Sequence, residues 1–113
     1  MEKRKRKRFV NLTYHDIVLI TQDGETVTIP PSGKIARVKF EPEVIDVVDG
    51  IPVVHIKYHD PVGLPEPEDG VYYLVSSTIK NAVGEKRPDV VATYSIERVN
   101  GKPAYAKGVR ING

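Results

Sequence analysis

The sequence predicts a mainly β domain, either a small antiparallel barrel or a sandwich, with one short helix near residues 77–83. Three observations support this prediction. Short runs rich in β-branched and aromatic residues recur along the chain. Gly, Pro, Asn and Asp separate these runs, as expected for strands joined by tight turns. A single stretch carries both the apolar spacing and the end signals of a helix. An α+β arrangement is the alternative.

Three dipeptides predict hairpin turns: Asp23-Gly24, Asp49-Gly50 and Asn100-Gly101. Asp-Gly and Asn-Gly favour the two-residue type I′ loop because both residues tolerate positive φ angles. Each dipeptide lies between two runs with strand composition. The paired runs are residues 16–20 with 25–29, 43–48 with 51–59, and 94–99 with 102–111.

Two further strands are expected outside these hairpins. Residues 34–40 alternate, with Ala36, Val38 and Phe40 on one face, and residues 71–76 (VYYLVS) read as a central strand. Between them, residues 63–70 (GLPEPEDG) contain too much proline for a strand or a helix and are expected to form a loop.

The expected helix covers STIKNAV. Ser76 or Ser77 can cap its first turn, and Ile79, Ala82 and Val83 share one face. Gly84 follows the last apolar position and can end the helix.

Length and composition describe one domain. The chain has 113 residues and no cysteine, so neither a disulfide framework nor a thiolate metal site is available. Its apolar runs are shorter than a membrane span, and no apolar signal-peptide core follows the basic start. We therefore expect no membrane association and a location in the cytoplasm of the host cell. Its many charged residues and single methionine favour a thermophilic source.

The positive charge is concentrated at the N-terminus. Residues 3–8 are six consecutive cations, whereas residues 9–113 carry 11 basic and 14 acidic side chains. The sequence therefore predicts a disordered basic tail, residues 1–8, ahead of a single β-rich domain, residues 9–113. Such a tail can bind the phosphates of DNA or RNA, or can simply keep the domain soluble. The residues of this possible contact are Lys3, Arg4, Lys5, Arg6, Lys7 and Arg8.

The sequence contains no recognisable catalytic or metal-binding motif. The tripeptide Tyr-His-Asp occurs at 14–16 and again at 58–60, and His55 lies near the second copy. Residues 51–59 alternate, with Val54, Ile56 and Tyr58 on one face and His55, Lys57 and His59 on the other, which we expect to be the solvent face. In an extended strand His55 and His59 would lie about 13 Å apart, too far to share one zinc ion. No nucleophile–base pair and no phosphate loop accompany them. We expect no catalytic residue, no metal and no cofactor.

Several polar residues are ambiguous. Glu66, Glu68 and Asp69 could bind a cation or a basic partner, or form a solvated acidic loop. Arg87 and Asp89 are expected to form a local surface pair or turn contacts.

The phrases FVNLTYHDIVLI, TIPPSGKIARV, GLPEPEDGVYYLVSSTIKNAV and KRPDVVA, in this order, resemble a family of small uncharacterised proteins encoded by phages, prophages and related archaeal viruses or elements. The similarity covers most of residues 9–94. Tyr14 and Pro88 depart from its usual residues. His15 matches the family's histidine, whereas His59 stands where glycine is usual, so the second Tyr-His-Asp is a coincidence. For His15 the favoured role is structural, with Asn or Thr side chains and the imidazole bonding the local backbone before a strand.

These observations predict a non-enzymatic accessory protein of a virus or mobile element that acts as a protein–protein interaction or assembly module. Its partner would be a viral or host protein, or further copies of itself in a homo-oligomer. The alternative is a nucleic-acid-binding protein that uses the basic N-terminal arm.

Overall fold

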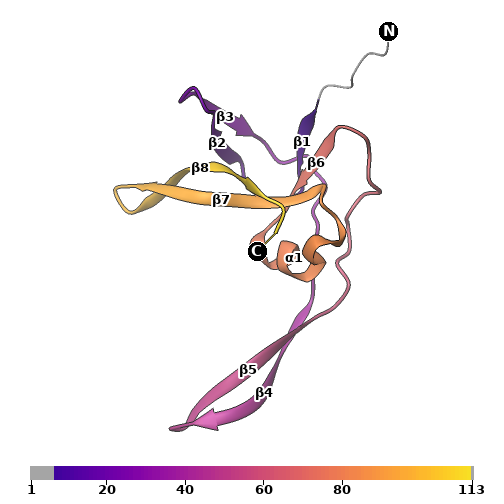
Figure 1. Cartoon of the computed structure of the whole chain (residues 1–113), viewed down its shortest axis with the longest axis vertical. Helices are drawn as coiled ribbons and strands as arrows, with labels where there is room; N and C mark the ends of the chain where they lie inside the picture. The colour runs from indigo at the N-terminus through magenta and orange to yellow at the C-terminus, as the bar shows by residue number, and fades with distance from the viewer. Residues whose placement is uncertain (1–6, 113) are drawn as a thin grey trace.

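The computed structural model describes residues 7–112 and confirms a mainly β fold with one short helix (Figure 1). Six strands form a nearly closed, barrel-like sheet in the order β1-β6-β7-β8-β2-β3, and two strands form a separate hairpin, β4–β5. The elements are β1 (Arg8–Asn11), β2 (Ile17–Ile20), β3 (Thr26–Ile29), β4 (Phe40–Val48), β5 (Ile51–Tyr58), β6 (Val71–Leu74), α1 (Ser77–Val83), the 3-10 turn η1 (Gly84–Lys86), β7 (Val90–Val99) and β8 (Lys102–Arg110).

The six-stranded sheet is mixed. The hairpins β2–β3 and β7–β8 are antiparallel, as expected, but β1–β6, β6–β7 and β2–β8 are parallel. The sheet is therefore mixed rather than antiparallel throughout. Parallel neighbours are joined by crossovers rather than tight turns, and α1 provides the crossover from β6 to β7. Turn signals in a sequence report pairing between consecutive strands, so they could not reveal these contacts.

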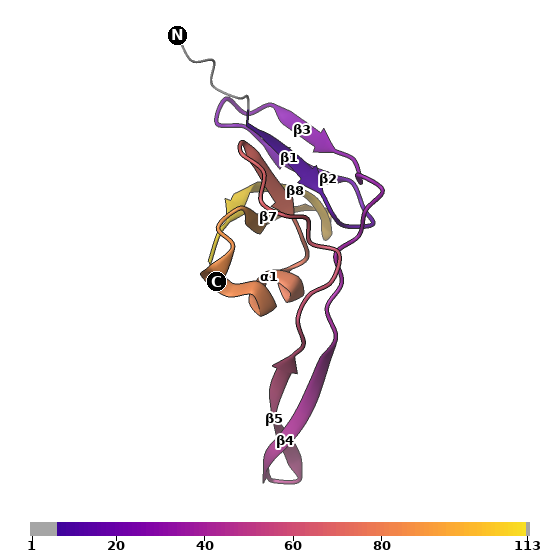
Figure 2. The same ribbon diagram turned by 90° about the vertical axis from the view of Figure 1, so that its right-hand side faces the viewer.

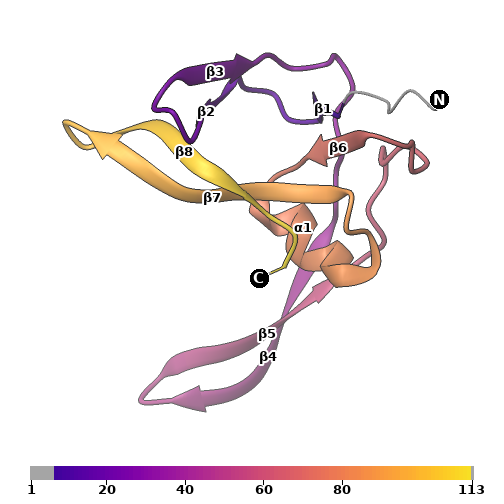
Figure 3. The same cartoon turned by 45° about the horizontal axis from the view of Figure 1, so that its top comes forward.

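The two outer strands of the sheet, β1 and β3, approach each other and nearly close it (Figure 3). Asn11 at the end of β1 forms a parallel bridge with Pro31, and the Ser32 amide donates to the Asn11 carbonyl at 2.9 Å. The Asn11 side chain, only 1% exposed, donates to the carbonyl of Ile29 at 2.9 Å. Asn11 thus fastens the end of β3 to β1.

The main core lies between the sheet and α1. Its buried members are Leu12, Ala36, Val71, Tyr73, Val75, Ile79, Val83 and Val90. The predicted end signals of the helix are confirmed. Ser76 is the N-cap, and its hydroxyl accepts from the Ile79 amide at 3.3 Å. Gly84 ends the helix with a φ of +65°. Burial of β6 confirms that residues 71–74 form a central strand.

Two of the three predicted type I′ turns are confirmed, because both residues have positive φ in Asp49-Gly50 and in Asn100-Gly101. At Asp23-Gly24 the prediction was wrong. Gly24 alone has a positive φ there, and the loop extends from Thr21 to Glu25, closed by the Thr21 amide donating to the Glu25 carbonyl at 2.7 Å.

Residues 34–39 do not form the expected strand. The Ala36 amide donates to the Leu12 carbonyl at 3.1 Å, which places Ala36 in the core below the sheet. Arg37 forms an isolated antiparallel bridge with Val62. The alternation of this segment therefore reflects a crossing from the core to the hairpin, in which Phe40 is the first residue of β4 and is 54% exposed.

Candidate interaction site

The β4–β5 hairpin projects from the rest of the molecule (Figures 1 and 2). We call residues 40–58 the arm. The projection makes the molecule elongated, with extents of 62 × 38 × 24 Å. Every residue of β4 and β5 is exposed except Ile56, which is half-buried. The arm is thus a two-stranded sheet that the described part of the chain leaves largely uncovered.

The strand register gives the arm two chemically different faces. Residues directly opposite each other in an antiparallel pair share a face. On one side the pairs are Phe40 with Tyr58, Pro42 with Ile56, Val44 with Val54 and, after a bulge at Ile45, Val47 with Pro52. None of these eight residues is charged. We call this set the apolar face.

The opposite side, which we call the polar face, carries the pairs Glu41 with Lys57, Glu43 with His55 and Asp46 with Val53, and near the tip the apolar pair Val48 with Ile51. Lys57 lies 3.6 Å from the Glu43 carboxylate across the strands. Such exposed ion pairs contribute little to stability. The charged side chains instead identify the side of the arm that is solvated.

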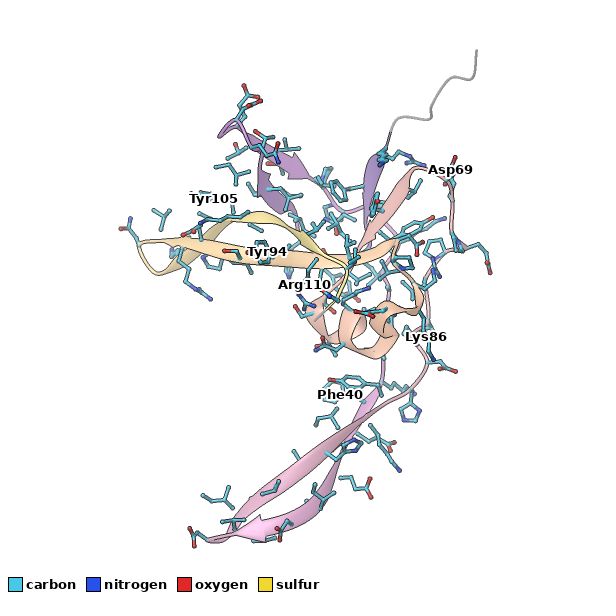
Figure 4. All side chains as sticks on the ribbon, in the orientation of Figure 1. Phe40, Asp69, Lys86, Tyr94, Tyr105 and Arg110 are labelled. Atoms are coloured by element: carbon cyan, nitrogen blue, oxygen red, sulfur yellow. The ribbon has the colours of Figure 1, made fainter. Side chains whose placement is uncertain are left out.

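The apolar face is uncovered to a degree that is unusual for a soluble protein. Phe40, Val44 and Val47 are 54%, 58% and 58% exposed, and Val54 and Tyr58 are 44% and 41% exposed. Phe40 and Tyr58 pack their rings at a centroid distance of 6.3 Å, and Figure 4 shows Phe40 at the base of the arm, the end nearest α1. An isolated two-stranded hairpin is marginally stable in water, and large exposed apolar patches mark interaction surfaces.

The base of the arm is fixed by backbone contacts. The amide and carbonyl groups of Arg37 and Val62 bond each other reciprocally at 2.8 Å, and the His59 amide donates to the Lys39 carbonyl at 2.8 Å. Next to this base, Gly63 has a φ of +85°, and a Cβ atom there would lie 2.4 Å from the Ile35 carbonyl oxygen. Glycine is therefore required where the chain leaves the arm.

The histidines do not form a common site. His55 is on the polar face, and His59 follows the arm with its Nε2 atom 3.4 Å from the Glu41 carboxylate. Within residues 7–112, no three His, Cys, Asp or Glu side chains come together in a way that could hold a metal ion.

His15 lies in a turn organised by its neighbours. The Asn11 amide group donates to the His15 carbonyl at 2.7 Å, and the Thr13 hydroxyl accepts from the His15 amide at 3.3 Å. The expected role of Asn and Thr side chains is confirmed. The bonds that fix the turn involve the His15 backbone, and the residue itself is exposed.

Arg87 and Asp89 form the expected local pair, but the pair is half-buried rather than at the surface. Their side chains are 24% and 19% exposed, and the guanidinium makes two hydrogen bonds to the carboxylate, at 2.9 and 2.8 Å. Arg87 also donates to the Pro65 carbonyl at 2.9 Å, so it anchors the proline-rich loop. The hydrogen bonds from Arg87 hold the pKa of Asp89 below its ordinary value, although burial opposes the shift.

Lys80 is a buried cation that sequence reasoning did not single out. It is 2% exposed, and its Nζ atom donates to the carbonyls of Gly84 at 2.9 Å and Arg87 at 3.3 Å. Burial lowers the pKa of Lys80, and the nearby Arg110 charge adds to this effect. Both contacts are to backbone carbonyls that follow α1, so Lys80 stabilises the end of the helix.

Of the proposed nucleic-acid contacts, Lys3, Arg4, Lys5 and Arg6 lie outside the described residues. Lys7 is exposed, and Arg8 is the first residue of β1, with its guanidinium 3.6 Å from the Glu68 carboxylate. Glu68 belongs to the acidic loop. Its neighbour Asp69 lies at the tip of the turn before β6 (Figure 4).

The arm itself was missed as an interaction site. The alternation in residues 51–59 correctly separated Val54, Ile56 and Tyr58 from His55 and Lys57, but only the face of His55 and Lys57 was expected to meet solvent. A signal was present in Pro42 and Pro52, one in each strand. Proline within a sheet is confined to edge strands. One proline in each strand of the hairpin therefore indicates that both are edge strands, with no further strand paired beside either of them.

Comparisons of the chain with protein-family models, with curated proteins and with solved structures find no significant match. Among residues 7–112, none of the helical segments has the length and apolar character needed to cross a membrane.

Proposed function

We propose that this chain is a non-enzymatic accessory protein of a virus or mobile element and acts as a protein–protein interaction or assembly module. The apolar face of the arm is its interaction surface. The observation that carries the proposal is the sorting of side chains in the arm. Eight uncharged residues lie on one side, every charged residue of the two strands lies on the other, and the arm makes hardly any contact with the barrel.

Face packing is favoured over strand addition. A partner strand that extended the arm at its edge would need backbone donors along that edge. Pro42 and Pro52 remove one N–H group from each strand. The partner therefore covers the face of the hairpin.

Burial supplies the driving force for this contact. Full burial of one Val, Ile or Phe side chain contributes about 1.5–3 kcal/mol, and the side chains of the apolar face are roughly half-exposed. Covering the six of them that are not proline would contribute several kcal/mol, on the order of the cost of ordering two proteins in a complex.

A photo-crosslinking amino acid placed in the arm tests the proposal in the cells that normally make the protein. Val54 and Val53 form a matched pair, because they are adjacent, 44% and 41% exposed, and on opposite faces. We expect a protein adduct from position 54 and none from position 53. Equal adducts from both positions, or none from position 54, would contradict the proposal.

The alternative function is nucleic-acid binding by Lys3–Arg8. It is favoured by the run of six cations, and the remaining residues 9–113 would not assist because they carry a net charge of −3. For a tail that neutralises about five phosphates, the logarithm of the affinity should fall with the logarithm of salt with a slope near −4 to −5.

Fluorescence anisotropy with a short duplex tests this alternative. Deletion of residues 1–8 should abolish binding. Binding that survives the deletion, or that discriminates between sequences, would contradict a contact made by the tail.

A further inference from the structure

We infer that the arm's apolar face docks into an apolar groove at the opposite end of a second copy of this chain, so that copies join head to tail. The inference rests on the proposed function and names its partner. It is drawn from the chemistry of the groove, the distribution of charge and the position of the two surfaces.

The groove lies where β1, β2, β3 and β8 meet and has a volume of about 280 Å³. Phe9 from β1, Leu19 from β2, Val27 and Ile29 from β3, and Val109 from β8 contribute to its lining. Phe9 and Val27 are 37% and 45% exposed, so the groove is open to a partner. Its apolar lining matches the Val and Ile side chains of the apolar face.

The distribution of charge also favours a contact between the arm of one copy and the groove of another. The arm contains Glu41, Glu43, Asp46 and Asp49 against Lys57, a net charge of −3, which is the entire net charge of residues 9–113. The groove adjoins the basic start of the sequence, since residues 3–8 directly precede Phe9. Of the two described cations there, Lys7 is exposed, whereas Arg8 lies beside Glu68. Opposite charges around an apolar contact favour encounter and fix its orientation.

The positions of the two surfaces prevent one copy from using both on itself. The arm lies at one end of the longest axis, and β1, β2 and β3 lie at the other (Figures 1 and 2). A contact between arm and groove must therefore join two molecules. Because the two surfaces differ, the contact is heterologous and generates a ring or an open filament.

Pairing of two arms through their apolar faces is the competing arrangement. It would bring together two segments that each carry a net charge of −3, and it would leave the groove open. The head-to-tail contact covers both apolar surfaces and places the acidic segment beside the basic one.

Two interface variants distinguish these arrangements. Val54→Lys places a charge on the apolar face of the arm, and Val27→Glu places one in the groove. The matched controls are Val53→Lys on the polar face and Thr28→Glu, which neighbours Val27 on an exposed strand. Circular dichroism and thermal melting would establish that all four variants are folded.

Sedimentation velocity should show concentration-dependent assembly for the wild type and both controls, and a monomer for each interface variant alone. In an equimolar mixture, Val54→Lys still offers a groove and Val27→Glu still offers an arm. The mixture should therefore form a one-to-one dimer that does not grow further.

Three results would overturn the inference. Assembly of Val27→Glu alone would indicate arm-to-arm pairing, and a monomeric mixture would show that arm and groove do not meet. A wild type that stays monomeric up to about 1 mM, where even weak association would be detected, excludes a second copy as the partner. If position 54 still crosslinks to a different protein, the proposed function stands without this inference.

Discussion

The barrel and the arm are built from similar sequences but stand in opposite environments. In the barrel, β6 reads VYYL and its residues are buried or half-buried. In the arm, β5 reads IPVVHIKY and all but one of its residues are exposed. Both segments have high strand propensity and an apolar face. The difference shows that alternation in a sequence identifies an apolar face without indicating whether the same chain covers it.

Truncation of buried and exposed side chains should give the largest contrast between the two regions. Leu74→Ala in β6 removes a side chain that is 0% exposed, and we expect a loss of about 3 kcal/mol in the free energy of unfolding. Val54→Ala in the arm should cost less than about 0.5 kcal/mol in dilute, monomeric protein. Urea unfolding of both variants measures the contrast. Similar losses would mean that the arm belongs to the cooperative core.

The Arg87–Asp89 pair gives the stability of the barrel a pH dependence. Because the pKa of Asp89 is lowered in the folded state, its contribution is present above the ordinary Asp pKa of about 4 and is lost as pH falls through the folded value. We expect Asp89→Asn to cost about 2 kcal/mol at pH 7.

The cost of Asp89→Asn should shrink as the pH falls below about 4. The test is to measure the free energy of unfolding of wild type and variant at several pH values between about 2.5 and 7. A difference that stays constant over this range would mean that the Asp89 charge does not stabilise the fold.

Glycine at the base of the arm should have a smaller but specific effect. Gly63→Ala places a Cβ atom on a residue with positive φ, which is strained, and brings that atom against the Ile35 carbonyl. We expect the free energy of unfolding to fall by more than about 1 kcal/mol. Gly33 is the matched control, because it has a φ of +93° and open space around its Cβ position. Melting temperatures of both alanine variants separate the two effects. An equal loss at the two sites would show that the contact at Gly63 is unimportant.

Removal of the arm should have the smallest effect on stability. Lys39 and His59 are already joined by a backbone hydrogen bond of 2.8 Å, so an Asn-Gly turn can replace residues 40–58. We expect the barrel to keep its melting temperature within a few degrees, because the arm contributes none of the buried core. A protein that no longer folds would show that the arm is part of the barrel's folding unit.

Local features of the fold could be predicted from the sequence, whereas long-range ones could not. Ser76 and Gly84 define α1 because helix caps act within one turn, and Asn100-Gly101 defines the β7–β8 hairpin because its φ preferences are intrinsic. The parallel contacts of β1 with β6 and of β2 with β8 depend on packing between distant segments. No local signal encodes them.

The candidate site was predictable in part. Alternation placed Val54 and Tyr58 on one face and His55 on the other, as the register of the arm confirms. It did not indicate that the apolar face is uncovered, because exposure depends on where the rest of the chain folds. The buried position of Asn11 was missed for the same reason, because its carbonyl partner Ile29 is distant in the sequence. Lys80 bonds the nearby carbonyls of Gly84 and Arg87, but its burial likewise depends on how the rest of the chain packs around it.

Amide hydrogen exchange at increasing protein concentration tests most directly whether a second copy covers the arm. In dilute protein, the amides of β4 and β5 should exchange much faster than those of β6 and β7, because a lone hairpin opens readily. At concentrations where copies associate, exchange in the arm should slow at least about tenfold, equivalent to 1.4 kcal/mol of added protection, while the barrel core stays unchanged. An arm that exchanges at the same rate at every concentration would contradict the account.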